Sequence, residues 1–241
     1  MNSILILDTS YTIQMIKDRG LHQALNSRKL NGFFKKVISV HPLEGLLNHN
    51  KKFGLPVVHK IDKNHIFISG KIGINKFLKF FPSINFLLSQ YNLLKILIFL
   101  SKKNKVNIIR IGDPYYLGLL GFLLSKILKV PLAIRIGANY DLFVQQTGKP
   151  MMKKLFKFRF IEKYVEKFVL SKCDMVIGAN KTNLKYAIQN GAKTKKLAVF
   201  RYGNLIHPSH WTHPGKRKKP YSLIKLLDLK RNSFVTIVSR L

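Results

Sequence analysis

The feature that most constrains the fold is the stretch over residues 106–141, VNIIRIGDPYYLGLLGFLLSKILKVPLAIRIGANYD. Its apolar run at 106–111 predicts a buried strand, residues 115–128 predict an apolar helix, and residues 132–136 predict a second strand. Two short apolar runs separated by one helix-length segment are typical of a βαβ unit with parallel strands. Ligands bind beyond the carboxyl ends of the strands in such sheets. The polar loop after each strand is therefore expected at a ligand-binding edge.

The same alternation continues along the rest of the chain. We expect strands at 3–7, 36–40, 175–177 and 197–200, helices at 13–30, 83–101, 149–172 and 180–189, and a hairpin formed by 56–60 with 65–69. This layout predicts an α/β fold, with a Rossmann-like, mostly parallel sheet and helices on both faces. A segment at 202–220 that contains Pro and Gly is typical of a surface linker, and 234–238 predicts a further strand.

The composition limits the partners that the protein can bind and the cellular compartment in which it is expected. Lys and Arg total 43 against 10 acidic residues, a formal charge of +33, which favours a polyanionic neighbour such as anionic lipid or nucleic acid. A single cysteine, Cys173, excludes an internal disulfide framework, suits a reducing compartment and is expected to be buried. The amino terminus lacks the pattern of a signal peptide. The most membrane-like segment, 86–100, is about 15 residues long, shorter than the ~20 apolar residues of a spanning helix. We expect a cytoplasmic protein.

Five segments, taken in order, resemble the amino-terminal half of the family-4 glycosyltransferases, enzymes of the two-Rossmann GT-B fold. They are LILDTSYT, IIRIGDPYYLGLLGFLLSKILKVPLAIRIGANYD, EKFVLSKCDMVIGANKTNLKYAIQNGA, VFRYGNLIHPSHW and the terminal VTIVSRL. The resemblance implies one half of a GT-B fold: an acceptor-binding domain at 1–204, an interdomain linker at 205–232, and at 233–241 the first strand of a truncated donor-binding domain. Arg240, in Ser239-Arg240-Leu241, occupies the position of a family arginine that contacts the donor diphosphate.

This resemblance implies hexosyl transfer, with retention of configuration, from a nucleotide sugar to a sugar or lipid-linked acceptor. The fragment is expected to be inactive alone, to bind no cofactor itself, and to need the nucleotide-sugar donor only as part of the full-length enzyme. No catalytic residue is assigned. One alternative is a non-catalytic acceptor-binding or membrane-recruiting subunit that uses a separate donor-domain chain. A basic nucleic-acid-binding protein is the other, but no zinc-finger or RNA-recognition signature is present, so no specific nucleic acid is expected.

Acceptor-site candidates come from the polar loops at the carboxyl edge, because sugars and lipid phosphates need hydrogen-bonding side chains beside a cationic or amide-lined pocket. The candidates are Asp8, Thr9, Tyr11, His41, Asp113, Tyr115, Asn139, Tyr140 and Asp141. Two of them have structural alternatives: Asp113, before a proline, can organise a turn, and Asp141 can cap the next segment.

Three weaker patterns remain in the sequence. Gly118 and Gly121 lie on a predicted helix and indicate close helix packing, not a dinucleotide fingerprint. The eight histidines show no metal-ligand spacing, so no metal is expected. Basic and aromatic residues cluster in a pattern that favours docking of a peripheral enzyme on the anionic, cytoplasmic face of a membrane, at Lys76, Phe77, Lys79, Phe80, Lys153, Lys154 and Lys157. Alternatively, the phenylalanines belong to the core and the lysines are solvated.

Overall fold

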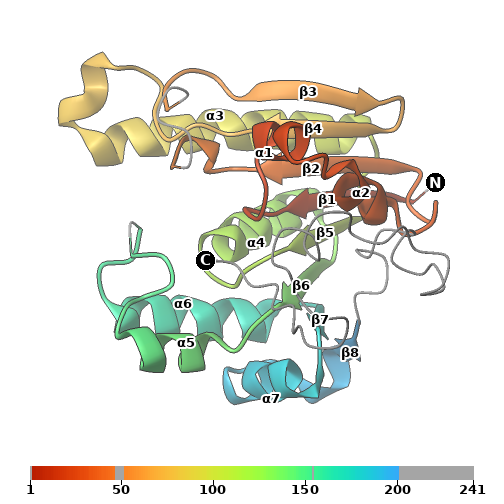
Figure 1. Ribbon diagram of the computed structural model, residues 1–241, viewed down its shortest axis with the longest axis vertical. Coiled ribbons are helices and arrows are strands. Elements are labelled where there is room, and N and C mark those ends of the chain that lie inside the picture. The colour runs from red at the N-terminus through yellow and green to blue at the C-terminus, as the bar shows by residue number, and fades with distance from the viewer. Residues whose placement is uncertain (1, 47–51, 154, 201–241) are drawn as a thin grey trace, which may run out of the picture. The chain divides into compact units, whose positions relative to one another are not determined.

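The computed structural model describes residues 2–46, 52–153 and 155–200 (Figure 1). By its internal contacts the chain divides into Met1–Gly203 and Asn204–Leu241, and every described residue belongs to the first unit. The linker predicted at 205–232, the strand predicted at 233–241, Arg240 and Lys154 lie outside the described residues.

The described unit is built on one eight-stranded sheet of order β3-β4-β2-β1-β5-β6-β7-β8. The strands are β1 (Ser3–Leu7), β2 (Lys36–His41), β3 (Val57–Asp62), β4 (His65–Ser69), β5 (Ile108–Ile111), β6 (Leu132–Ile136), β7 (Met175–Gly178) and β8 (Leu197–Val199). All neighbours are parallel except β3 and β4, which form the predicted antiparallel hairpin at one edge. Every residue of β1 is buried, as a central strand covered on both faces requires.

Helices cover both faces of the sheet, so the predicted fold class is confirmed. On one face α3 (Pro82–Lys103), α4 (Tyr116–Leu128), α6 (Arg159–Lys172) and α7 (Lys181–Gln189) contribute to the large apolar core, and the first three lie one after another along the sheet (Figure 1). On the other face α1 (Ile13–Asp18) and α2 (His22–Asn26) pack Ile16 and Leu25 against Phe67 of β4. Short 3-10 turns, η1 (Ser27–Lys29), η2 (Glu44–Leu46), η4 (Phe77–Phe80) and η5 (Thr194–Lys196), lie between these elements.

The close packing predicted for the glycines of α4 is confirmed. A Cβ atom on Gly118 would lie 2.8 Å from Val169 Cγ1 of α6, and one on Gly121 would lie 2.4 Å from Ile111 Cγ2 of β5. Both distances are far below ordinary contact, so glycine is what allows α4 to approach the sheet and α6 together. Cys173 is buried as expected, 1% exposed, and burial raises the pKa of its thiol to about 12.

Several element boundaries differ from the prediction. The helix expected at 13–30 is divided into α1, α2 and η1. The basic helix expected at 149–172 begins only at Arg159, because Glu162 accepts hydrogen bonds from the backbone N–H groups of Met151 and Met152 and folds the preceding segment back onto the helix. The polar loop expected to run to residue 141 ends earlier, since α5 (Tyr140–Thr147) begins within it and Asn139 accepts hydrogen bonds at its amino terminus.

Helix α3 is longer than the sequence predicted. Among the described helices it alone has the length and apolar composition that could cross a membrane. Its Leu93 and Leu97 are nonetheless fully buried in the sheet core, and its Ser89 and Gln90 side chains donate hydrogen bonds to the Lys71 carbonyl oxygen at 2.8 Å each. One face of the helix is therefore packed in the core, whereas Leu87, Tyr91 and Phe99 on the rest of its surface are more than half exposed.

Candidate functional site

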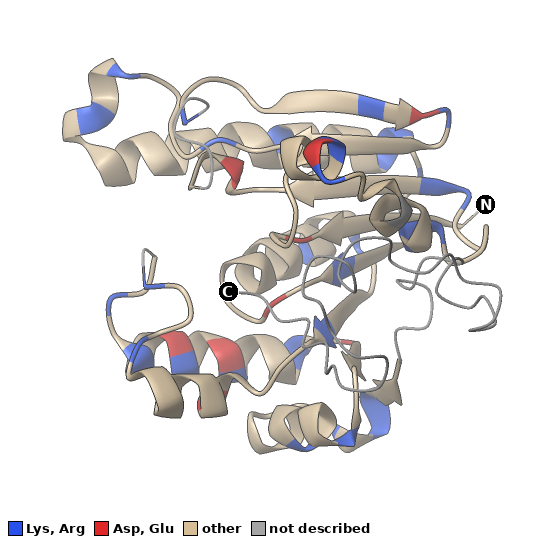
Figure 2. Ribbon diagram, in the orientation of Figure 1, with Lys and Arg blue, Asp and Glu red and all other residues tan. Residues whose placement is uncertain are grey.

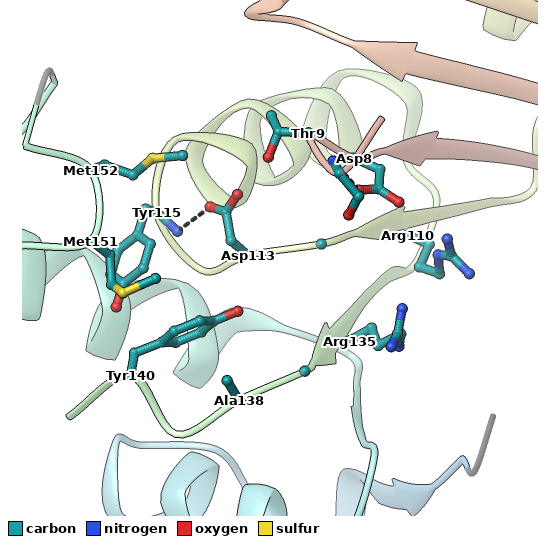
Figure 3. Close-up of a pocket in the computed structure, with 13 residues that line it drawn as sticks. Asp8, Thr9, Arg110, Asp113, Tyr115, Arg135, Ala138, Tyr140, Met151 and Met152 are labelled. Carbon is teal, nitrogen blue, oxygen red and sulfur yellow. Dashed lines mark hydrogen bonds between the residues drawn. The ribbon is translucent and has the colours of Figure 1, made fainter. Parts of the chain in front are cut away.

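A cavity of about 400 Å³ lies where the direction of strand addition reverses, between β1 and β5. From β1 the chain adds β2 and β4 to one side, and from β5 it adds β6, β7 and β8 to the other. Such a reversal leaves a crevice at the carboxyl ends of the central strands, the usual ligand position in open α/β sheets. The cavity is lined by Asp8, Thr9, Ser10, Arg110, Gly112, Asp113, Tyr115, Arg135, Gly137, Ala138, Tyr140, Met151 and Met152 (Figure 3).

The loop after β1 supplies a fixed carboxylate. Asp8 accepts a hydrogen bond from the Ser10 N–H at 2.8 Å and pairs with Arg28 Nη2 at 3.2 Å. Burial opposes ionisation of Asp8, but Arg28, Ser10 and Arg110 together outweigh it and hold the pKa of Asp8 below its usual value. Asp8 is therefore ionised at neutral pH and already paired with Arg28.

The loop after β5 holds the second carboxyl group of the cavity. Asp113 accepts a hydrogen bond from the Tyr115 N–H at 2.9 Å, so it does organise the turn before α4 (Figure 3). It also lines the cavity. Burial is the main reason that the pKa of Asp113 rises from 3.8 to about 7, and the negative charges of Asp8 and Glu162 add to the effect. The turn role and a ligand-facing role are thus both compatible with its position.

Two tyrosines form an aromatic wall. The rings of Tyr115 and Tyr140 lie 5.5 Å apart, tilted by 57°, and Tyr140 packs edge-on against Tyr186 at 5.8 Å. Burial raises the pKa of both Tyr115 and Tyr140, so both are neutral hydrogen-bonding groups. Met151 and Met152 complete the apolar part of the lining on the side away from the arginines (Figure 3).

An ion-pair network behind the cavity fixes this wall. Tyr115 Oη donates to Glu166 Oε2 at 2.9 Å, and Arg159 donates to Glu166 at 3.1 Å and to Glu162 at 2.7 Å. Both glutamates are fully buried. Since Glu162 also holds the backbone of the Met151–Met152 segment, the network positions two parts of the lining at once. Sequence reasoning missed both glutamates, although carboxylates at i and i+4 in such a basic helix were a visible signal.

Four of the acceptor candidates are not among the residues that line the cavity. Asp141 pairs with Arg159 at 2.7 Å and with Lys163, and Asn139 caps α5. His41 is 1% exposed with Nε2 3.2 Å from the Thr9 carbonyl oxygen, and burial lowers its pKa against the opposing charges of Glu44 and Asp8. Tyr11 packs against the apolar cluster of α1, α2 and β4. The other five candidates do line it.

Arg110 and Arg135 are the two charged lining residues that sequence reasoning did not propose as ligand contacts. Each stands inside an apolar parallel strand, in an Ile-Arg-Ile-Gly sequence that occurs at 109–112 and again at 134–137. A charged residue in the interior of such a strand is uncommon. The presence of one arginine in each of the two strands, just before each polar loop, could have identified both as candidate ligand contacts.

Aromatic side chains are exposed on two segments beside this edge. Phe77 is 87% exposed and Phe80 78% exposed on η4, so these two do not belong to the core. Lys79 Nζ lies 5.1 Å from the centre of the Phe80 ring, and Lys157 Nζ lies 5.5 Å from that of Phe158, which is 49% exposed. Within the described part of the chain, no group of three or more His, Cys, Asp or Glu side chains is placed to hold a metal ion.

Comparisons with known proteins bear on the fold. No family model and no curated protein matches the chain. Sucrose-phosphate synthase from Thermosynechococcus elongatus is similar at a TM-score of 0.53 and 16% identity, over 83% of this chain and 48% of that one. A shorter chain of the same enzyme is similar at a TM-score of 0.50 and 13% identity, over 84% of this chain and 90% of that one. A complex of Anabaena HepE with UDP reaches only 0.47, at 14% identity, over 83% of this chain and 44% of that one.

The chain thus spans about half the length of the longer synthase chain. At 16% and 13% identity the likeness concerns the fold and not the activity. The described unit has the Rossmann-like α/β fold that GT-B enzymes share.

Proposed function

We propose that the described unit is the acceptor-binding half of a retaining, nucleotide-sugar-dependent glycosyltransferase that resembles family 4. The observation that carries the proposal is the cavity at the β1–β5 reversal, in which polar groups face an aromatic and methionine wall. A sugar ring presents hydroxyl groups on its edge and C–H groups on its faces, so it needs both kinds of lining. The 400 Å³ volume lies within the usual range of small-ligand pockets.

The donor half is proposed to be a second Rossmann-like domain, because the described unit corresponds to about half of the synthase chain. Two sources of that half are open: a continuation of this polypeptide, as Arg240 would require, or a separate chain. In the second case this protein is an acceptor-binding subunit. Reading the coding DNA beyond codon 241 separates them: an in-frame lysine shortly after Arg240 and a later Glu-rich donor motif support the enzyme, and a stop codon supports the subunit.

Acceptor binding is testable on the chain itself. Thr9 lines the cavity with a partly exposed side chain, and a sugar hydroxyl in the cavity would reach it. We expect Thr9→Val to weaken binding of a methyl hexoside about fivefold to tenfold, the effect of losing one hydrogen bond of ~1 kcal/mol. Thr147→Val is the matched control, because the Thr147 hydroxyl donates to the Phe143 carbonyl of its own exposed helix. Saturation-transfer NMR across a panel of hexosides measures the affinity. Absence of binding to every hexoside would refute the proposed acceptor site.

Membrane docking is proposed for the exposed aromatic residues of η4 and of the segment before α6. Both follow the carboxyl edge of the sheet, where the cavity lies, so a membrane on this side would present a lipid-linked acceptor to the site (Figure 1). Lys and Arg are spread over many elements and occur on both segments, whereas acidic residues are few (Figure 2). Cations beside interfacial aromatics are typical of peripheral proteins on anionic lipid.

Vesicle sedimentation tests the docking surface. The full chain is expected to sediment with phosphatidylserine-containing vesicles, not with phosphatidylcholine vesicles, and to be released by salt. The double variant Phe77→Ser and Phe80→Ser is expected to lose about tenfold or more in partitioning, since each ring contributes ~1 kcal/mol or more when it leaves water. Phe33→Ser is the control: Phe33 is 60% exposed but precedes β2, at the opposite edge. Equal loss in both variants would contradict the assignment.

A further inference from the structure

Helix α3 is apolar on the side that faces away from the sheet. A helix on the surface of a globular protein normally carries charged and polar residues on that side. In α3 the residues at helical spacing on the outward side are mostly large and apolar. The exposed ones are Ile84, Leu87, Leu88, Tyr91 and Phe99. The outer surface of this helix is therefore suited to an apolar neighbour.

Polar side chains lie on the buried side of the same helix and fix its rotation. Asn85, Ser89 and Gln90 are all buried. Ser89 and Gln90 donate to the Lys71 carbonyl oxygen, and Asn85 donates to the Asn75 carbonyl oxygen at 2.8 Å. A rotation of α3 that buried its outward leucines would break these hydrogen bonds and leave polar groups without partners. The outward position of the apolar residues is thus specified by the fold.

The apolar surface continues from α3 onto the neighbouring helix α4. The two helices are in contact and lie side by side on one face of the sheet (Figure 1). Leu119, Leu123 and Ile127 of α4 are exposed and follow one another at intervals of four residues, so they form a second stripe. At its amino terminus α3 joins η4 through Phe81, which is also exposed. We call the exposed apolar residues of α3 and α4 the outer apolar face.

The charges around the outer apolar face are all positive. The elements η4, α3 and α4 contain lysines but no aspartate or glutamate. Lys95 Nζ lies 5.0 Å from the centre of the Tyr91 ring, and Lys126 Nζ lies 5.4 Å from that of Phe122. A lysine in such a position can keep its stem beside the ring in apolar surroundings and place its ammonium group among lipid phosphates.

The charge distribution decides between two apolar neighbours, a second copy of the chain and a membrane. A second copy would bring lysines against lysines with no carboxylate on either helix to separate them, and the whole chain already has a formal charge of +33. An anionic lipid surface offers an apolar layer beneath a layer of negative charge, so it matches both the leucines and the lysines.

We propose that the outer apolar face lies in the surface of an anionic membrane, with α3 parallel to the membrane plane. This rests on the membrane docking of the proposed function and extends it from the rim of the cavity along a whole helix. Helix α3 has 22 residues and is about 33 Å long, so its far end lies near the amino edge of the sheet. Docking by η4 alone would leave that end in water. The helix does not cross the membrane in this arrangement, because Leu93 and Leu97 stay in the core of the protein.

A fluorescent label at each end of the face tests this orientation. Leu87→Cys and Phe99→Cys, about 18 Å apart along the helix, are prepared in the full chain and labelled with nitrobenzoxadiazole. The native Cys173 does not compete for the label, because its thiol is buried. With phosphatidylserine-containing vesicles that carry a spin-labelled lipid, we expect both labels to lose about half of their fluorescence or more, since a helix in the membrane plane keeps both positions near the acyl chains.

Phe33→Cys, labelled in the same way, is the matched control and should remain unquenched. Phe33 is about as exposed as Phe99 and lies at the same edge of the sheet, just before β2. Its neighbour Phe34 packs against Ile4 and Ile6, on the sheet face opposite to α3. In a second measurement without labels, the double variant Leu87→Ser and Phe99→Ser is expected to partition into the vesicles about tenfold or more weakly than wild type. Phe33→Ser should partition as wild type.

The remaining outcomes separate the orientation from the docking itself. Quenching of the Leu87→Cys label without that of Phe99→Cys overturns the in-plane orientation and leaves docking by the rim standing. A chain that binds no vesicle overturns both, whereas the binding of hexosides still tests the acceptor site separately. If the Phe99→Cys label enters apolar surroundings without vesicles as the protein concentration rises, a second copy covers the face and the inference is wrong. Equal quenching of all three labels overturns it as well.

Discussion

Replacing Asp113 by asparagine should make the protein more stable, and more so at high pH. The pKa of Asp113 rises from 3.8 to about 7 on folding, so between these values the folded state binds the proton that the unfolded state has released. Stability therefore falls as pH rises through this window, because ionisation is easier in the unfolded chain. The asparagine side chain of the Asp113→Asn variant does not ionise, and its oxygen can still accept the hydrogen bond from the Tyr115 N–H.

The magnitude follows from the two pKa values. Each tenfold difference in acidity corresponds to ~1.4 kcal/mol, so a change from 3.8 to about 7 costs about 4 kcal/mol when Asp113 is fully ionised. About 2–3 kcal/mol of this falls between about pH 5 and pH 8, and screening by solvent at the open side of the cavity lowers the expected difference to about 1–2 kcal/mol. For a chain of this size we expect the gain in Tm from Asp113→Asn to be roughly 3–8 °C larger at pH 8 than at pH 5.

Thermal unfolding of wild type and Asp113→Asn at the two pH values measures this difference. Comparing variants at each pH cancels the titration of all other groups, among them the buried histidines. Asp18→Asn, on the exposed face of α1, controls for the loss of one carboxylate from a strongly basic chain. A gain that is the same at both pH values, or larger at pH 5, would refute the buried-carboxyl argument.

Three further predictions concern the frame around the cavity. Glu166→Gln removes the charge of a fully buried carboxylate from half-buried Arg159 and Lys163, which both keep Asp141 as a counter-charge. It should cost about 1–3 kcal/mol of unfolding free energy, measured by urea denaturation, and an unchanged stability would contradict the network. Gly118→Ala should cost about 1–3 kcal/mol of unfolding free energy, because its Cβ would lie 2.8 Å from Val169. Gly137→Ala, whose Cβ would have nothing within 4 Å, should be nearly neutral. Urea denaturation measures both, and equal losses of stability would contradict the close packing of α4 against α6. Burial lowers the pKa of His65 to about 4, so its imidazole should stay neutral at pH 5, which NMR titration measures. The stability of the fold should fall as pH falls from about 6.5 toward 4, because the unfolded chain then binds a proton that the folded chain does not. A charged His65 ring at pH 5 would disprove the effect of burial.

Several elements were predictable because their signals are local. The apolar runs at β1, β2 and β6 alone specify buried strands, and Asn180 with Asn190-Gly191 marks both ends of α7 through capping groups within three residues. Helix α4 was predicted to within one residue, since its flanking turn and apolar period lie in one continuous segment. The fold class followed from the alternation of such elements.

The start of α6 shows where local signals were insufficient. Residues 149–158 have a helical apolar pattern in sequence, yet the segment folds back because Glu162 binds the backbone of Met151 and Met152. That contact depends on the burial of Glu162 beside Arg159, which no periodicity within the segment reports. A tertiary hydrogen bond therefore outweighed the helix propensity.

The sequence by itself determined that this chain forms an α/β sheet whose polar loops gather at the carboxyl edge, because strand and helix periods and turn residues act within a few positions of one another. Only the tertiary structure decided which side chains meet there. Arg110 and Arg135 come together because β5 and β6 are neighbours in a particular register, and Tyr115 meets Glu166, 51 residues later, because α6 packs against α4. Contacts between distant segments are fixed by strand order and packing, which the local pattern of residues does not encode.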